Sequence, residues 1–167
     1  HTFYFYTKDI TQDEEACLSL NAAGQRVRPK SPSGPGQICY THPLTREVFL
    51  RKLHEYITSD RQKCPPNDAP PYIYVLEQND NPDYCRCENC LKLLEKYGCY
   101  SGVMLDFLNA IAREIGKTYP EIKLLANAYM FTSDPPQGIV PEKNVIIRLA
   151  QLGREWGTQG LRDTMRP

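Results

Sequence analysis

The sequence lacks long apolar runs, and it lacks an excess of either charge. No run approaches the roughly 18 apolar residues of a membrane-spanning helix, and 20 Lys and Arg residues balance 20 Asp and Glu residues. The first absence argues against a membrane span. The second argues against nucleic acid or anionic lipid as a partner, because no net field would attract either. What remains, 41% hydrophobic and 24% charged residues, is typical of a globular chain.

The two ends of the chain also lack expected features. His1 stands where a start methionine would, no signal-type segment follows it, and the last segment, Gly153–Pro167, has no hydrophobic period. We therefore expect both ends to be cuts in a longer protein, so the missing signal says nothing about the compartment. A length of 167 residues suits one domain over residues 1–167 but falls short of the roughly 250 residues of a closed (β/α)8 barrel.

Hydrophobic patterns predict alternating strands and helices in the second half of the chain. The aromatic and β-branched run Tyr72–Leu76 predicts a strand covered on both faces. Gly102–Tyr119 carries apolar residues at helical spacing, and Pro120 ends it. The other predicted strands are Ile122–Phe131 and Asn144–Leu149. Because strand, helix and strand alternate, the predicted class is α/β, with parallel strands joined by right-handed crossovers.

Smaller elements are predicted in the first 60 residues. The alternating aromatic residues of 1–7 predict a strand, and the irregular acidic stretch Asp9–Glu15 predicts a loop. The segment Cys17–Val27 predicts a hairpin in which Gly24 supplies a positive φ. Further predictions are an exposed loop over Pro29–Gly36, a short buried strand at Ile38–Tyr40, and a helix capped by Thr41 that ends by Asp60.

Polar residues gather where the predicted parallel strands end. The candidates are Glu77, Gln78, Asn79 and Asp80 after the first strand, Asn127 and Tyr129 in the second, and Arg148 in the third. Ligands of parallel α/β folds bind at the carboxyl ends of the strands. Carboxylates at this edge could supply the acid and base of glycoside hydrolysis, while amides, a phenol and a guanidinium could hold sugar hydroxyls.

Structural roles compete with most of these assignments, and Glu77 could simply face solvent. The segment Asn79–Pro82 is also a good turn sequence, because short Asx side chains bond to their own backbone. Asn127 and Tyr129 could be internally satisfied polar groups, and His1 could be an exposed end. Arg148 lies in an otherwise apolar strand, where a buried guanidinium needs an anionic partner or a ligand.

Four cysteines lie close together in the sequence, at Cys85, Cys87, Cys90 and Cys99. Tetrahedral zinc prefers four thiolates or a mixture of thiolates and imidazoles, so a structural zinc site at these four residues is one prediction. Because only one CxxC pair is present, disulfides within the cluster or to Cys17, Cys39 or Cys64 are equally compatible, as are free buried thiols. A catalytic thiol is disfavoured, since thiol chemistry needs a nearby base and His42 and His54 belong to a predicted helix.

Several motifs together resemble a known family. They are QND at 78–80, YCRCENC at 84–90, FLNAIAREIGKTYP at 107–120, LLANAYMFTSDPP at 124–136 and KNVIIRL at 143–149, with HTFY, NAAGQRV and QICYTHP nearer the N-terminus. Over residues 1–150 the chain resembles a family of bacterial proteins labelled a domain of unknown function and related to glycoside hydrolases. The resemblance implies the central portion of a (β/α)8 catalytic domain, from extracytoplasmic proteins (periplasmic, surface or secreted) that degrade glycans.

Some members of that family are described as endo-β-N-acetylglucosaminidases in which the acetamido group of the substrate is the nucleophile. Such a mechanism needs one carboxylate as acid/base and a second group that orients the acetamide. Carried onto this sequence, Asn79 and Asp80 match the family's Asn-Asp at the strand end. His1, Tyr129 and Arg148 match polar positions of the motif segments. Because the chain is short, we expect an incomplete barrel with little activity by itself.

The favoured hypothesis is a fragment of a glycoside hydrolase with a carbohydrate substrate and no cofactor for catalysis. Glu77 and Asp80 are its candidate catalytic carboxylates, and either could be the acid/base. The alternative is a non-catalytic carbohydrate-binding module whose cysteine cluster holds a structural zinc ion or disulfides. A redox protein built on Cys87 and Cys90 is a third reading, disfavoured because redox CxxC motifs open a helix directly after a strand.

Overall fold

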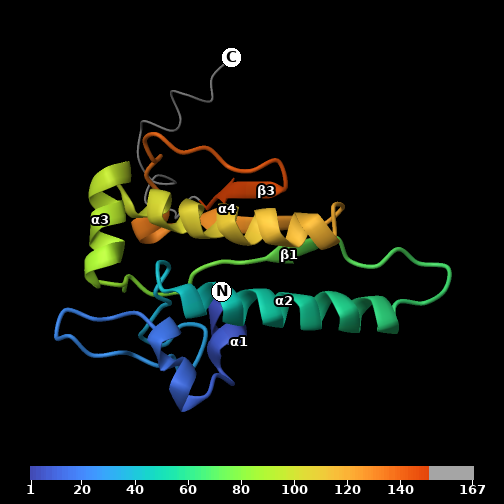
Figure 1. The fold of residues 1–167 in the computed structure, drawn as a ribbon, viewed down its shortest axis with the longest axis horizontal. Coiled ribbons are helices and arrows are strands. Elements are labelled where there is room, and N and C mark those ends of the chain that lie inside the picture. The colour runs from blue at the N-terminus through green and yellow to red at the C-terminus, as the bar shows by residue number, and fades with distance from the viewer. Residues whose placement is uncertain (151–167) are drawn as a thin grey trace, which may run out of the picture.

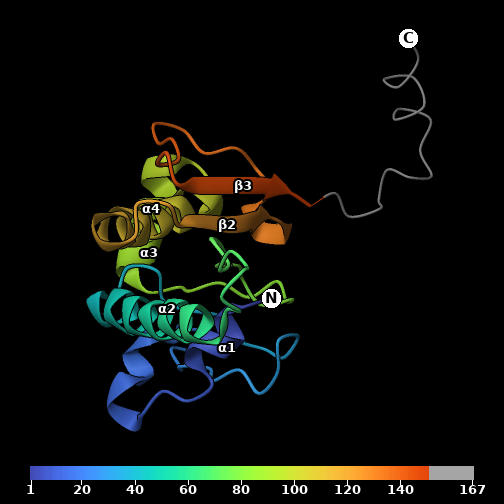
Figure 2. The ribbon, with the colours of Figure 1, turned by 90° about the vertical axis from the view of Figure 1, so that its right-hand side faces the viewer.

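The computed structural model describes residues 1–150. Its elements, in chain order, are α1 (Phe3–Thr7), η1 (Gln12–Cys17), α2 (Pro43–Lys63), β1 (Ile73–Val75), α3 (Glu88–Tyr97), α4 (Tyr100–Thr118), β2 (Lys123–Ala128), η2 (Met130–Thr132) and β3 (Val145–Leu149), where η marks a 3-10 helix. The three strands form one sheet in the order β1-β2-β3, and both pairs are parallel (Figures 1 and 2). The predicted α/β class with parallel strands is confirmed.

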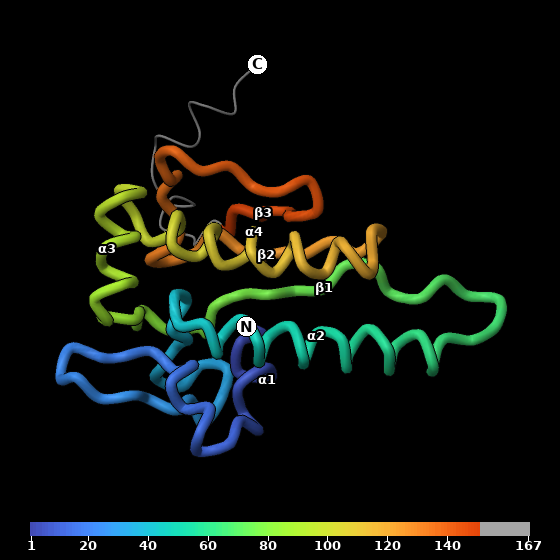
Figure 3. Tube along the Cα trace, in the orientation of Figure 1, coloured from blue at the N-terminus to red at the C-terminus, as the bar shows by residue number. Residues whose placement is uncertain are grey.

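Helices cover the sheet and each other in layers. The long helix α4 packs against β2 and β3, and α2 packs against α4, so that the two helices run side by side in the trace of Figure 3. The buried stripe of α4 includes Val103, Phe107, Ile111 and Ile115, as its helical spacing predicts. The described strands form an open three-stranded sheet, and a closed barrel is not shown.

Glycine allows α3 and α4 to approach closely. Gly102 lies in the first turn of α4, and a Cβ placed there would overlap the Cβ of Tyr97 at the end of α3. The αL conformation of Gly98, with φ 75°, ends α3 and turns the chain into α4. The two helices therefore meet backbone to side chain at a point where only a hydrogen atom fits.

The prediction of a strand at residues 1–7 is wrong, because Phe3–Thr7 forms α1. Its aromatic residues bury themselves by packing on α2: the Tyr6 ring stacks on the Phe49 ring at 4.7 Å, and the Phe3 ring meets the Phe49 ring edge-on at 5.3 Å. The Thr7 hydroxyl donates to the Phe3 carbonyl at 2.9 Å. Tertiary burial of these rings thus outweighs the local strand pattern.

Other boundaries differ from the predictions in detail. Helix α2 begins at Pro43, with the His42 imidazole rather than Thr41 accepting the capping bond from Leu44 N, and it runs on to Lys63. Helix α3 has no counterpart among the predicted elements. Part of the predicted loop at Asp9–Glu15 belongs to η1. The predicted strand at Ile38–Tyr40 is buried but forms only an isolated bridge, between Ile38 and Leu18. Because Ile73 is exposed, β1 is not covered on both faces.

The predicted hairpin is confirmed, with a bridge between Leu20 and Arg26 and a φ of 75° at Gly24. The predicted end segment Gly153–Pro167 lies outside the described residues. Within residues 1–150, none of the helices combines the length and the hydrophobicity that crossing a membrane requires.

Candidate functional site

The carboxyl end of β1 places Glu77 beside the N-terminal segment. Leu76 N still bonds to Leu125 O of β2 at 2.8 Å, so the ladder continues to the residue before Glu77. The Glu77 backbone carbonyl then accepts from Phe3 N at 3.0 Å, and the Thr2 hydroxyl accepts from Glu77 N at 2.9 Å. These bonds fix the direction in which the Glu77 side chain leaves the sheet.

The Glu77 carboxylate belongs to a chain of hydrogen bonds that crosses all three strands. One of its oxygens accepts from the backbone nitrogen of His1, and the other accepts from the Asn127 amide. The Asn127 carbonyl oxygen accepts from Arg148 Nε at 2.8 Å, and Asn127 and Arg148 are register partners in β2 and β3. The Glu77 side chain is only 10% exposed. Arg148 is exposed, so the expected burial of its guanidinium is wrong.

Asp80 lies at the more open side of the same site. Its Oδ1 accepts from the Tyr129 hydroxyl at 2.5 Å, its Oδ2 lies 3.7 Å from His1 Nε2, and its side chain is 35% exposed. The bond to Asp80 raises the pKa of Tyr129 to about 12, because losing the phenolic proton would set two negative charges against each other. Tyr129 therefore acts as a donor at neutral pH.

Gln78 and the turn after β2 position Tyr129. The buried Gln78 amide donates to the Tyr129 carbonyl at 3.0 Å and accepts from the Thr132 hydroxyl at 2.7 Å. Met130, next in the turn, has a φ of 50°, an uncommon value for a residue with a side chain. Through these two bonds, Gln78 holds the turn that carries Tyr129.

Asn79, which sequence reasoning assigned to substrate binding, forms hydrogen bonds within the protein. Its Oδ1 accepts from Tyr4 N at 2.8 Å, and its Nδ2 donates to Gly36 O at 3.1 Å. Its backbone amide donates to Oε1 of the buried Gln37 at 2.9 Å. Asn79 is completely buried and these groups are paired within the protein, as its role in the turn requires.

Gln37 is a residue that sequence reasoning missed. Its Nε2 donates to Asn79 O at 2.8 Å and to Asn81 Oδ1 at 3.0 Å, and its side chain is completely buried. It therefore holds the turn on both sides of Asp80. A lone glutamine in a loop carries no sequence signal for such a role.

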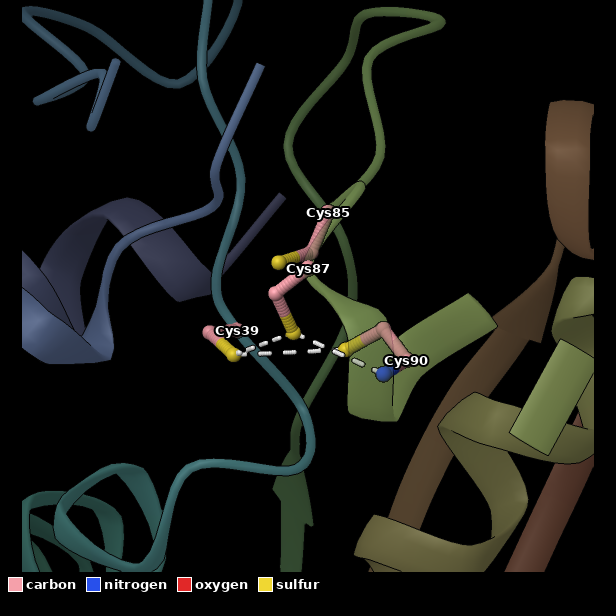
Figure 4. Close-up of side chains that lie close together, drawn as sticks. All are labelled: Cys39, Cys85, Cys87 and Cys90. Atoms are coloured by element: carbon pink, nitrogen blue, oxygen red, sulfur yellow. Dashed lines mark hydrogen bonds between the residues drawn. The ribbon is translucent and has the colours of Figure 1, made fainter. Parts of the chain in front are cut away.

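A second cluster, of four cysteines, lies beyond this turn (Figure 4). The sulfur atoms of Cys39, Cys85, Cys87 and Cys90 all lie within 4.8 Å of one another. Cys39 Sγ is 3.6 Å from Cys87 Sγ and 3.9 Å from Cys90 Sγ. All seven cysteines are free thiols. A cluster of this composition could bind a metal ion.

The fourth member of the cluster is Cys39, so the prediction that named Cys99 is wrong on this point. Cys99 Sγ lies 2.9 Å from Ser101 Oγ and 3.5 Å from Asp134 O, at the start of α4. Cys87 is the N-cap of α3, so the CxxC pair does open a helix. Hydrogen bonding to Cys39 raises the pKa of the Cys90 thiol above its ordinary value.

The fold and its two clusters define the class of this protein: an α/β domain with a carboxylate-containing site at the ends of parallel strands and a separate four-thiol cluster. The chain belongs to the family described as "Domain of unknown function (DUF4838)", whose model matches residues 14–163. Comparison with the curated proteins and with the solved structures found no match.

Proposed function

We propose that this protein is part of a glycoside hydrolase that acts on glycans, with Asp80 and Glu77 as its catalytic carboxylates. The observation that carries the proposal is the pair of carboxylates at one strand end, one buried and one partly exposed, held by polar residues of the neighbouring strands. Glycosidases use two carboxyl groups in different roles, and different surroundings are how proteins separate those roles.

Asp80 is the better candidate for the acid/base. A group that exchanges a proton with a glycosidic oxygen must reach the substrate, and the Asp80 side chain is 35% exposed. Tyr129 holds one of its oxygens and leaves the other turned toward His1. Both oxygens of Glu77 already accept hydrogen bonds, which suits a fixed group that stabilises positive charge developing on the sugar or orients its acetamide.

The neighbouring residues would bind sugar hydroxyls. Tyr129 bonds directly to Asp80, and the exposed Arg148 bonds to Asn127, which in turn bonds to Glu77. The resemblance to glycan-degrading proteins adds N-acetylglucosamine-containing glycans as the substrate class and an extracytoplasmic location. Cell fractionation tests the location independently of activity.

We also propose that the three strands belong to a (β/α)8 barrel. Parallel strands that follow one another in chain order are what such a barrel requires. Apolar side chains on β3 are exposed, Ile146 and Ile147 by 38% and Leu149 by 61%. Further strands and helices of a barrel would cover them. A structure of a longer chain that left β3 as a free edge would contradict this.

The test is an assay of the natural protein against N-glycans and simpler N-acetylhexosaminides. We expect cleavage, and we expect Asp80→Asn and Glu77→Gln each to lower turnover by about 100-fold or more. Asp13→Asn and Glu114→Gln are matched controls, because they make the same changes at exposed carboxylates away from the site. The controls should retain full activity.

Two results would overturn the proposal. Undiminished cleavage by both site variants would remove Asp80 and Glu77 from the mechanism. Glycan binding without cleavage by the wild-type protein, measured by calorimetry, would instead make this a non-catalytic carbohydrate-binding module.

A further inference from the structure

We propose that Cys39, Cys85, Cys87 and Cys90 together bind one zinc ion in a structural site. In a tetrahedral site with four sulfur ligands at about 2.3 Å from zinc, the sulfur atoms stand roughly 3.8 Å apart. The separations from Cys39 Sγ to Cys87 Sγ and to Cys90 Sγ are 3.6 and 3.9 Å, and all four sulfur atoms fall within 4.8 Å (Figure 4). The thiols already stand where an ion would hold them.

The donor set selects the type of metal. Four thiolates around one centre favour zinc over hard cations such as magnesium or calcium, which take oxygen ligands. Four protein ligands also leave no open position for water or substrate. The site would therefore stabilise structure and would not take part in catalysis.

Hydrogen-bond donors surround the sulfur atoms, as they do in stable metal-thiolate sites. Leu20 N donates to Cys85 Sγ at 3.3 Å, and Cys90 N donates to Cys87 Sγ at 3.5 Å. The Thr41 hydroxyl lies 3.2 Å from Cys90 Sγ. Cys87 also caps the ten-residue helix α3, whose amino end favours negative charge. These groups would disperse the negative charge that four thiolates leave on a zinc site.

An ion can reach the cluster from solvent. Cys85 and Cys90 are fully buried, but Cys87 is only half-buried. A cavity of about 240 Å³ opens beside the cluster and is lined in part by Cys39, Thr41 and Cys87. The site thus combines an access route with an otherwise buried set of ligands.

Disulfides explain the cluster less well. A disulfide joins two sulfur atoms at about 2.05 Å, much closer than the separations around Cys39. It would also use two thiols of the cluster and leave the other two, while a zinc ion uses all four. Four sulfur atoms grouped around one central point are expected for a metal ion and are not expected for disulfides.

The ion would fix the turn that carries Asp80. Cys39 lies two residues after Gln37, whose side chain bonds to Asn79 and Asn81. Cys85 begins the other side of the cluster shortly after the same turn. Zinc would therefore clamp the segment before α2 to the segment after β1, on both sides of the Gln37 contacts.

The test compares two cysteine variants by metal analysis. The protein is produced under reducing conditions with zinc and purified without chelator, and we expect about one zinc ion per chain. Cys39→Ser should retain at most about a tenth of that amount of zinc, because a ligand is lost. Cys99→Ser is the matched control and should retain all of it, since Cys99 lies outside the cluster. The competing prediction, with Cys99 as the fourth ligand, requires the opposite result.

A second measurement keeps the test valid if Cys39→Ser fails to fold. Wild-type protein is stripped of metal and titrated with cobalt, whose tetrahedral thiolate complexes absorb strongly in the visible range. Alkylation followed by mass mapping should find Cys39, Cys85, Cys87 and Cys90 protected with zinc and reactive after chelation. Cys64 should react similarly in both states, because it is outside the cluster. Absence of zinc together with absence of the cobalt signal, a disulfide among the four, or zinc loss only in Cys99→Ser would overturn the proposal.

Discussion

Replacing Gln37 by glutamate tests the turn that holds Asp80. The Gln37 Oε1 accepts from Asn79 N, and its Nε2 donates to Asn79 O and Asn81 Oδ1. Gln37→Glu keeps the first bond but turns an oxygen toward two acceptor oxygens. The new side chain can donate to one of those two oxygens, and only when its carboxyl group is protonated.

The loss of folding stability in Gln37→Glu follows from this geometry and grows with pH. At the completely buried position 37, the pKa of the glutamate should rise well above its ordinary range, because burial and the two facing oxygens disfavour the anion. A raised folded-state pKa makes the variant most stable at acidic pH and less stable as pH rises. Each pKa unit corresponds to about 1.4 kcal/mol, so a carboxyl group that stays protonated up to neutrality costs about 3–4 kcal/mol at pH 7.

Urea unfolding of wild type and variant between acidic and neutral pH measures this cost. Gln25→Glu is the matched control, because Gln25 is exposed and the same change there should give no pH-dependent difference. If the free energy of unfolding of Gln37→Glu equals that of wild type, or is lower by the same amount from acidic to neutral pH, the assigned hydrogen bonds are refuted.

Three further predictions concern packing, titration and metal. Gly102→Ala should destabilise the protein by about 2 kcal/mol, because its Cβ meets the Cβ of Tyr97, whereas Gly116→Ala in the same helix should be neutral or stabilise by up to about 1 kcal/mol; urea midpoints that do not differ would contradict the close packing. The stability advantage of wild type over Tyr129→Phe should be full below pH 10 and vanish as pH rises through about 12, since the bond to Asp80 needs the phenolic proton; chemical unfolding at alkaline pH checks this. Chelation of zinc-loaded protein should lower the thermal midpoint by roughly 10 °C if zinc was present at about 1,000 times its Kd; an unchanged midpoint in calorimetry would count against the ion.

The sheet and α4 could be predicted because their local patterns agree with their tertiary surroundings. Tyr72–Leu76 contains β1, and Gly102–Tyr119 covers nearly all of α4. Since parallel strands end at one edge, the grouping of Glu77 with Asn127 and Arg148 also followed from the order of the strands.

Two of the misses, α1 and Cys39, depend on contacts far away in the sequence. The segment α1 is helical because its aromatic rings pack on α2. The sequence pattern of residues 1–7 carries no information about that surface. Cys39 is 48 residues from Cys87, so spacing alone favoured the nearer Cys99. Helix α3 did leave a local signal, in the N-capping Cys87 and the αL Gly98.

The long separation between Cys39 and the other three cysteines has a consequence for the order of folding. Cys85, Cys87 and Cys90 are close in sequence and could capture an ion in an unfolded chain, before any strand has paired. Cys39 can join only after the segment before α2 meets the segment after β1, which closes a loop of about 50 residues at a cost in chain entropy. A chain that acquires zinc early would therefore complete its coordination only when its core is in place, and full coordination would report that folding has finished.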